Sequence, residues 1–218
     1  MLADYLCQVV TAVPSVIPLL SVKAKEALLG YPPIRAAYFA EIYDAVEGYL
    51  TSDRPTTAFS NSARAAMSEA FTDAAYEGYQ NAGAELPLAD DVSAWLSERI
   101  AAERENITAL FERLKEGRGT LDPIAEAMAR AEGYTKTLDA MYNEAKMRGT
   151  SNATLVFDGD DGAESCPDCQ KMKGKRHTIK YILANNLIPK PGNDTYECKG
   201  YRCEHFWMNP KTGERFGG

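Results

Sequence analysis

Four cysteines and a histidine lie close together in the last third of the chain. The sequence contains Cys166-Pro-Asp-Cys169 and, after an intervening loop, Cys198-Lys-Gly-Tyr-Arg-Cys203-Glu-His205. A Cys-x-x-Cys pair places two sulfur atoms on one tight turn, where both can reach a single tetrahedral ion at about 2.3 Å. The second group offers three further ligands. We therefore predict a structural zinc site that uses four of these five residues.

The two cysteine pairs together favour a closed site with four sulfur ligands. His205 is an alternative to Cys198 or Cys203, or it lies beside the ligands without binding the ion. The other histidine, His177, belongs to a basic run and is interpreted as a solvated or strand residue. A closed four-sulfur site leaves no position for a reactive water molecule, so the ion would have a structural role.

The competing interpretations of these cysteines are disulfides or thiols without metal. Disulfides need an oxidising compartment, and the first residues carry Asp4 where a signal peptide has lysine or arginine. The apolar stretch over residues 6–20 is interrupted by two prolines and by polar residues, so it is too short and too broken to span a membrane. We therefore favour zinc and expect no membrane contact.

Composition indicates a chain that folds, with its negative charge in the first part. Hydrophobic residues make up 45% and charged residues 25% of the chain, and the net charge is -7. Residues 1–150 contain 14 Lys and Arg against 22 Asp and Glu, a net charge of -8. Residues 151–218 contain 10 against 9, a net charge of +1. The acidic part suits protein contacts better than the phosphate backbone of nucleic acid.

Residues 1–150 have helical periodicity throughout. We expect a first helix that Pro14 ends, a second that begins at Pro32-Pro33, and a third, with small inward residues, that Ser60 or Ser62 caps. Two long helices follow, from Asp90 to about Lys115 and over residues 123–148, the latter capped by Asp122. The fold class is therefore mainly α, with an elongated helical N-terminal region arranged as a hairpin or bundle. Apolar residues 9–10 and 16–20 are the expected exposed patch for another chain.

The composition changes at Gly149, where a small α+β module is expected to begin. We predict a strand over residues 153–157, an acidic turn over 158–162, a short helix over 178–186 and a terminal hairpin over 206–216. A module of this size buries too little apolar surface to be stable alone. Binding of a structural metal would supply the missing folding free energy. The predicted organisation is a helical assembly domain over 1–150 and a Cys-rich zinc-binding module over 151–218.

The order of motifs in this module resembles a known family. A strand ending in acids precedes Cys-x-x-Cys, and the segments Lys171-Met-Lys-Gly-Lys175, Ile188-Pro-Lys-Pro-Gly192 and Tyr196-x-Cys-x-Gly-Tyr-x-Cys203 follow. This order is similar to the C-terminal module of the minor head, or head-morphogenesis, proteins of tailed bacteriophages. The resemblance covers about residues 154–207, and the helical part matches only in character.

The resemblance implies which residues pair and what the protein does. The paired cysteines of the family correspond to the two pairs here, and Gly174 to the glycine after the first pair. The closing pattern of the family is shorter than Cys198-x4-Cys203, which leaves open which of Cys198, Cys203 and His205 completes the site. The implied function is a non-catalytic minor virion protein of the phage head or neck, present in host cytoplasm during assembly.

The partners that the resemblance implies are proteins of the capsid vertex. They are the portal protein, the major capsid protein, or both, and the chain would be homo-oligomeric or present in several copies. Contact with packaged DNA is also compatible with this position. The acidic helices fit such a role, because they can bind protein while repelling DNA that passes nearby.

Two other function classes compete with this interpretation. A zinc-ribbon nucleic-acid-binding protein would use the basic stretch beside the first cysteine pair, which contains Lys171, Lys173, Lys175, Arg176 and Lys180, with Tyr181 nearby. The simpler interpretation of that stretch is a solvated loop that offsets neighbouring acids.

An enzyme is the third class. The sequence has no His-x-Glu, no His-Glu-x-x-His, no P-loop and no Gly-x-Ser-x-Gly, and it holds only two histidines. Acidic pairs such as Glu103 with Glu105 are interpreted as an exposed helix face. We therefore expect no catalysis.

Overall fold

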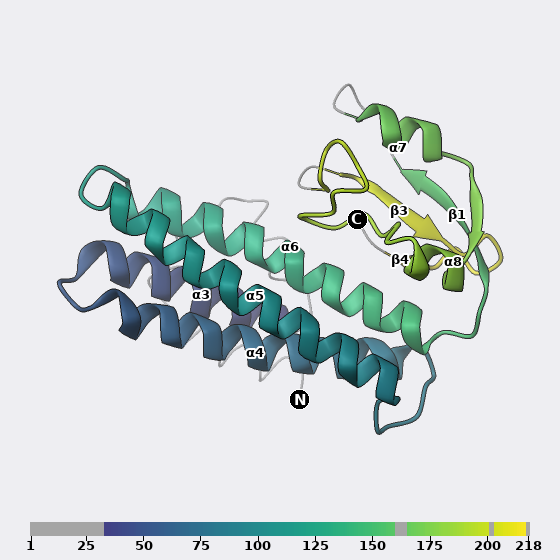
Figure 1. Ribbon diagram of the computed structural model, residues 1–218, viewed down its shortest axis with the longest axis horizontal. Helices are drawn as coiled ribbons and strands as arrows, with labels where there is room; N and C mark the ends of the chain where they lie inside the picture. Colours follow the sequence, from purple (N-terminus) through teal and green to yellow (C-terminus); the bar gives the residue numbers. More distant parts are fainter. Residues whose placement is uncertain (1–32, 160–164, 201–202, 217–218) are drawn as a thin grey trace. The chain divides into compact units, whose positions relative to one another are not determined.

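The computed structural model describes residues 33–159, 165–200 and 203–216. They form a mainly helical protein with a small strand-containing region at the C-terminal end, as the sequence predicts (Figure 1). The predicted first helix, its apolar patch and residues 160–162 of the acidic turn lie outside the described residues. Among the described residues, no helix combines the length and the apolar character that a membrane crossing requires.

The described elements follow one another as four long helices and then short helices that alternate with strands. The long helices are α3 (Pro33–Thr51), α4 (Thr56–Asn81), α5 (Asp90–Gly117) and α6 (Pro123–Gly149). The C-terminal elements are β1 (Thr154–Gly159), α7 (Pro167–Met172), β2 (Arg176–Thr178), α8 (Ile179–Ala184), β3 (His205–Met208) and β4 (Arg215–Phe216).

The chain divides into two compact units, and α4, α5 and α6 each contribute to both. Within the described residues, the first unit holds 33–70 and 98–135, and the second holds 71–97 and the chain from residue 136 onward. The composition change at Gly149 coincides with the end of α6. As a domain boundary, residue 150 stays a prediction.

The first unit is centred on the aromatic face of α3. Five of the six residues that helical spacing places on this face are buried, and the sixth, Leu50, is half-buried; the five are Ala36, Phe39, Ile42, Tyr43 and Val46. Tyr38 and Tyr49 are buried with them. Tyr49 packs edge to face against Phe59 of α4 and Phe111 of α5, with ring centroids 6.1 and 5.6 Å apart. Edge-to-face pairs stabilise beyond the area they bury, so α3 joins the helices of this unit.

Helix α4 begins earlier than the sequence predicts. Its first residue is Thr56, so the prediction of Ser60 or Ser62 as the cap is wrong. Both serines lie within the helix, where Ser60 is buried. Pro55 accounts for the difference, because it fixes its own backbone angle and its carbonyl accepts a hydrogen bond from the N–H of Ala58 at 3.0 Å. The predicted inward face of small residues is confirmed as buried: Ala63, Met67, Ala70, Phe71, Ala74, Ala75 and Gly78.

In helices α5 and α6, most of the apolar residues that recur at helical spacing are buried, as the sequence predicts, and Ile100, Met128, Tyr134 and Tyr142 are half-buried. Asp122 caps α6 as predicted, because its Oδ1 accepts hydrogen bonds from the N–H groups of Ile124 and Ala125 at 3.0 and 3.2 Å. The helical spacing of the sequence places Ile124 on the apolar side of α6, yet this residue is 41% exposed in the first turn of the helix.

The interpretation of Glu103 as part of an exposed face is wrong. Its side chain is buried and accepts a hydrogen bond from Asn106 Nδ2 at 3.0 Å. Burial raises the pKa of Glu103, and the Asn106 hydrogen bond and the Arg99 charge oppose the rise. The partner in the next turn therefore compensates for a carboxyl group that interrupts the apolar stripe.

The C-terminal region is a four-stranded antiparallel sheet in the order β2-β1-β3-β4. The predicted strand, short helix and terminal hairpin are confirmed as β1, α8 and the β3–β4 pair. The sequence did not reveal α7 or β2, which are only six and three residues long. Side chains of these elements form one core together with Met147 of α6, and its members include Leu155, Phe157, Ile179, Ile182, Trp207 and Phe216.

Close helix packing in the second unit depends on Gly78. A Cβ atom at this position would lie 2.4 Å from the backbone oxygen of Tyr142 on α6. We expect Gly78→Ala to lower the free energy of unfolding by about 1–3 kcal/mol, because the backbones would have to move apart. Urea denaturation followed by circular dichroism measures this change.

Gly133 provides the matched control, because it also lies within a helix but a Cβ atom there meets nothing within 4 Å. Gly133→Ala should raise the free energy of unfolding by about 0.5–1 kcal/mol through helix propensity. Equal effects of the two substitutions would contradict the packing argument.

Candidate metal centre

The first pair of candidate ligands is held by the start of α7. Cys166 is the N-cap residue, and its sulfur accepts a hydrogen bond from the N–H of Cys169 at 3.5 Å. Pro167 occupies the first turn, where its missing N–H costs nothing. The proline inside the Cys-x-x-Cys pair therefore starts the turn that brings the two sulfur atoms together.

Cys198 projects from a loop that only glycine can complete. The following residues Lys199 and Gly200 have φ angles of 49° and 72°, in the left-handed region. Gly200 is buried, and a Cβ atom there would lie 2.0 Å from the backbone oxygen of Lys190. The backbone N–H of Gly200 also donates to the sulfur of Cys198. Gly200 thus sets both the turn and the position of the third sulfur.

Cys203 and His205 enter the site from the start of β3. The Sγ of Cys203 and the Nδ1 of His205 are 3.7 Å apart. The His205 ring is stacked on Phe157 of β1, with centroids 5.5 Å apart and an interplanar angle of 8°. The strand register that pairs Gly159 with His205 supports this stacking. The sheet therefore fixes the orientation of the imidazole ring.

All five predicted ligand residues are brought together, in two overlapping groups. Cys166, Cys169 and Cys198 form one group, and Cys169, Cys203 and His205 form the other, with donor atoms within 4.8 Å of one another in each. The sulfur atoms of Cys169 and Cys203 are 3.5 Å apart. Two sulfur ligands of one tetrahedral ion are about 3.8 Å apart at ordinary metal–sulfur distances, so the cluster can bind a metal ion.

Cys169 is the shared member of the two groups and the most buried of the four cysteines. Its side chain is 1% exposed, whereas Cys166, Cys198 and Cys203 are half-buried. Phe157 and Tyr196 pack beside this cluster, with their rings stacked at 6.1 Å. The site thus lies at the edge of the apolar core, where a metal ion would be shielded from water on its inner side.

The thiol groups differ in their acidity. Burial raises the pKa of Cys166, but hydrogen bonds from the backbone N–H groups and the thiols of Cys169 and Cys198 together outweigh it, so the pKa is lowered overall. Burial raises the pKa of Cys169, and the neighbouring thiols add to the rise. Burial also raises the pKa of Cys198, and the N–H of Gly200 only partly opposes it. A cation at the centre would supply the charge that favours the thiolate form at all three positions.

His177 lies in β2, as the strand interpretation proposed. Its ring stacks on Tyr181 with centroids 4.5 Å apart, and it belongs to neither of the two metal-binding groups found among the described residues. Sequence reasoning missed the supporting roles of Phe157, Tyr196 and Gly200. Only Gly200 carried a signal, because a glycine two residues after a cysteine is typical of a turn that directs an N–H group toward sulfur.

The comparisons with known proteins add no family to this description. No family model matches the chain, and neither a curated protein nor a solved structure shows significant similarity to it.

Removal of the shared cysteine should abolish metal binding. Cys169→Ser deletes the donor that both groups use, so we expect the metal content to fall from about one ion per chain to nearly none. Elemental analysis of the purified protein, beside a thiol titration, measures this directly. Cys7→Ser is the chemically matched control, and its metal content should equal that of the unmodified chain. Retention of a full ion by Cys169→Ser would contradict the assigned cluster.

Metal affinity should fall in acid. The thiol pKa values of Cys169 and Cys198 are raised by burial, so both groups bind protons at neutral pH until a metal displaces them. Each displaced proton weakens apparent affinity about tenfold per pH unit. We expect at least a tenfold loss per unit between about pH 8 and about pH 6, measured by competition with a chelator. An affinity independent of pH would exclude thiolate ligands.

Proposed function

We propose that the protein is a zinc-stabilised, non-catalytic minor structural protein of a tailed-phage virion. It acts in head morphogenesis or at the portal vertex, with the portal or the major capsid protein as partner. The observation that carries this proposal is the convergence of Cys166, Cys169, Cys198 and Cys203 in a module whose order of motifs resembles the C-terminal module of that family.

Zinc is the metal that this set of ligands favours. Thiolates are soft ligands, and a closed tetrahedral set of sulfur atoms is typical of structural zinc. We assign the four cysteines as ligands. His205 lies 3.7 Å from the Cys203 sulfur, which suits an N–H to sulfur hydrogen bond that would orient that ligand. Its stacking on Phe157 holds the ring in this position. The ion would supply folding free energy rather than chemistry.

The small module explains why a metal would be needed. Its strands are between two and six residues long, and the helices α7 and α8 have six residues each. Elements this short bury little apolar surface, and structural zinc contributes about 10–16 kcal/mol in small finger peptides. An ion that ties three separate segments together would therefore stabilise a module with few other long-range constraints.

Virion composition tests the proposed role. Quantitative mass spectrometry of purified particles from a phage that encodes this chain should find it in few copies relative to the major capsid protein. Particles assembled with the Cys169→Ser chain should contain less of it or none, because the module would not fold. Absence of the unmodified chain from complete virions would contradict the structural role, whatever its metal content.

A second candidate function rests on the exposed basic side chains beside the metal centre. Lys171 of α7, Arg176 of β2 and Lys180 of α8 are exposed, as is Lys175 in the turn between α7 and β2. Tyr181 of α8 is 47% exposed. Such a basic and aromatic surface is typical of nucleic-acid binding. Lys171 pairs with Asp168 at 3.7 Å, which reduces the available charge. A steep dependence of DNA affinity on salt would favour this function, and no binding at low salt would exclude it.

A further inference from the structure

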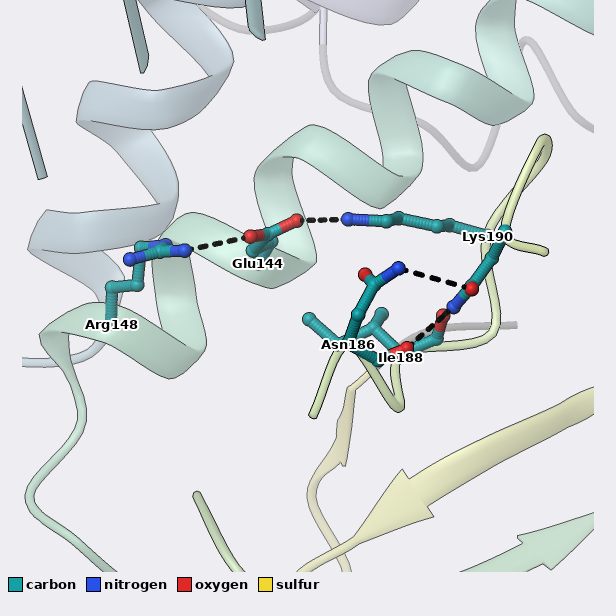
Figure 2. A network of polar contacts seen from close by, with 6 residues as sticks. Glu144, Arg148, Asn186, Ile188 and Lys190 are labelled. Carbon is teal, nitrogen blue, oxygen red and sulfur yellow. Dashed lines mark hydrogen bonds and ion pairs between the residues drawn. The ribbon is translucent and has the colours of Figure 1, made fainter. Parts of the chain in front are cut away.

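A buried line of charges joins α6 to the segment that precedes the Cys198 loop. Glu144 Oε2 lies 2.8 Å from the Nζ of Lys190, and Glu144 Oε1 lies 2.9 Å from Nη2 of Arg148. Figure 2 shows the carboxylate between the two cations, with the Lys190 side chain extended toward the helix. The Arg148 guanidinium in turn lies over the ring of Trp95 on α5, 4.5 Å from its centroid.

The Glu144–Lys190 pair is one of the few buried ion pairs of the described chain. The Glu144 residue is 5% exposed and Lys190 is 8% exposed. Charged side chains are rarely buried to this extent unless they are paired. Burial raises the pKa of Glu144, but the two cations outweigh it and hold the pKa below its usual range. The carboxylate is therefore charged at neutral pH and attracts Lys190 in a medium where screening is weak.

The backbone of Lys190 supports the loop that carries Cys198. Its carbonyl oxygen accepts a hydrogen bond from the N–H of Asn193 at 3.1 Å and lies against Gly200, the residue whose N–H donates to the Cys198 sulfur. The N–H of Gly192 also donates to the carbonyl of Lys199 at 2.8 Å. The segment after Lys190 and the segment after Cys198 therefore run against each other with almost no space between them.

A buried asparagine holds the other side of the same segment. Asn193 is 2% exposed, and its Nδ2 donates to the carbonyl oxygens of Asn186 and Ile188, both at 2.7 Å. Dashed lines in Figure 2 mark hydrogen bonds of this network at Asn186 and Ile188. The loop has few conformations left once these bonds form, so a displacement of Lys190 would be passed on to Gly200 and Cys198.

We propose that Glu144 is a positioning residue for the metal centre. Glu144 does not contact the ion. Its ion pair holds Lys190 in place, and Lys190 fixes the loop that presents Cys198. Metal affinity therefore depends on a carboxylate of α6. Linkage requires the reverse effect as well, so metal binding stabilises the last turns of α6. This inference rests on the proposed metal site and adds the route by which the ion acts on the helix.

The test compares zinc affinity in the full chain and in Glu144→Gln, by competition with a chromophoric chelator. We expect Glu144→Gln to bind zinc at least tenfold more weakly, a loss typical of residues that orient metal ligands. Glu126→Gln is the matched control, because Glu126 forms a similar pair with Arg130 near the start of the same helix. Its zinc affinity should equal that of the unmodified chain.

A second variant separates positioning from a general loss of folding. Glu144→Gln removes the carboxylate that faces the buried Lys190 ammonium, whereas Glu144→Gln combined with Lys190→Met removes both members of this pair. Arg148 loses the same carboxylate in both variants, so that loss cancels in the comparison. The double variant should fold with its helix content intact and still bind zinc at least tenfold more weakly than the unmodified chain. Its loss should be no greater than that of Glu144→Gln alone, because both changes break one connection. A double variant that binds zinc well below the affinity of Glu144→Gln alone would overturn the inference.

Hydrogen exchange supplies a readout at the helix itself. Zinc should slow amide exchange over residues 144–149 in the unmodified chain and in Glu126→Gln, but much less in Glu144→Gln. A chain that takes up no zinc would overturn both the metal site and this inference. Equal zinc affinity and equal protection in the unmodified chain and Glu144→Gln would overturn the inference alone.

Discussion

The structure of the C-terminal region depends on one constraint, the approach of sulfur atoms from three separate segments to the buried sulfur of Cys169. Cys166 and Cys169 belong to the start of α7, Cys198 to a loop, and Cys203 to the residues just before β3. Bringing such segments together costs chain entropy that grows with the length of the closed loops. Hydrogen bonds and apolar contacts around the cluster offset part of this cost, and a bound cation would offset the remainder.

The surrounding residues show how the segments are directed to that point. Gly200 allows the backbone of one loop to touch Lys190, and Gly159, with a φ angle of 146°, allows β1 to approach His205, since a Cβ atom there would lie 2.6 Å from the His205 Cα. Phe157 stacks on His205, and Tyr196 donates its hydroxyl to the carbonyl of Leu187 at 2.8 Å. Close backbone contacts therefore substitute for the long elements that this region lacks.

The last turns of α6 pack against the C-terminal region that holds the metal centre. Met147 is part of the apolar core, Lys146 pairs with Glu214 at 2.6 Å, and Glu144 pairs with Lys190 at 2.8 Å. Three side chains that follow one another along the helix thus contact the core, the β3–β4 hairpin and the segment before the Cys198 loop. The end of α6 is consequently both the last part of the helical region and a support for the module that follows.

Helical periodicity and cysteine spacing were strong enough to predict much of this from the sequence. Long helices repeat the same pattern over many turns, so local errors such as the start of α4 at Thr56 do not hide them. The cysteines were identifiable because two pairs with ligand spacing occur together. Elements as short as α7 and β2 show no such repetition, and pairs such as Glu144 with Lys190 join residues far apart in sequence, so neither could be predicted.

X-ray absorption spectroscopy at the zinc edge, on the purified full chain, tests the central claim most directly. We predict about one zinc per chain with sulfur neighbours at about 2.3 Å, four of them if Cys203 rather than His205 completes the site. Three sulfurs and one nitrogen would place His205 among the ligands and keep the site. A spectrum with only oxygen or nitrogen neighbours, or a protein without bound metal, would contradict the account.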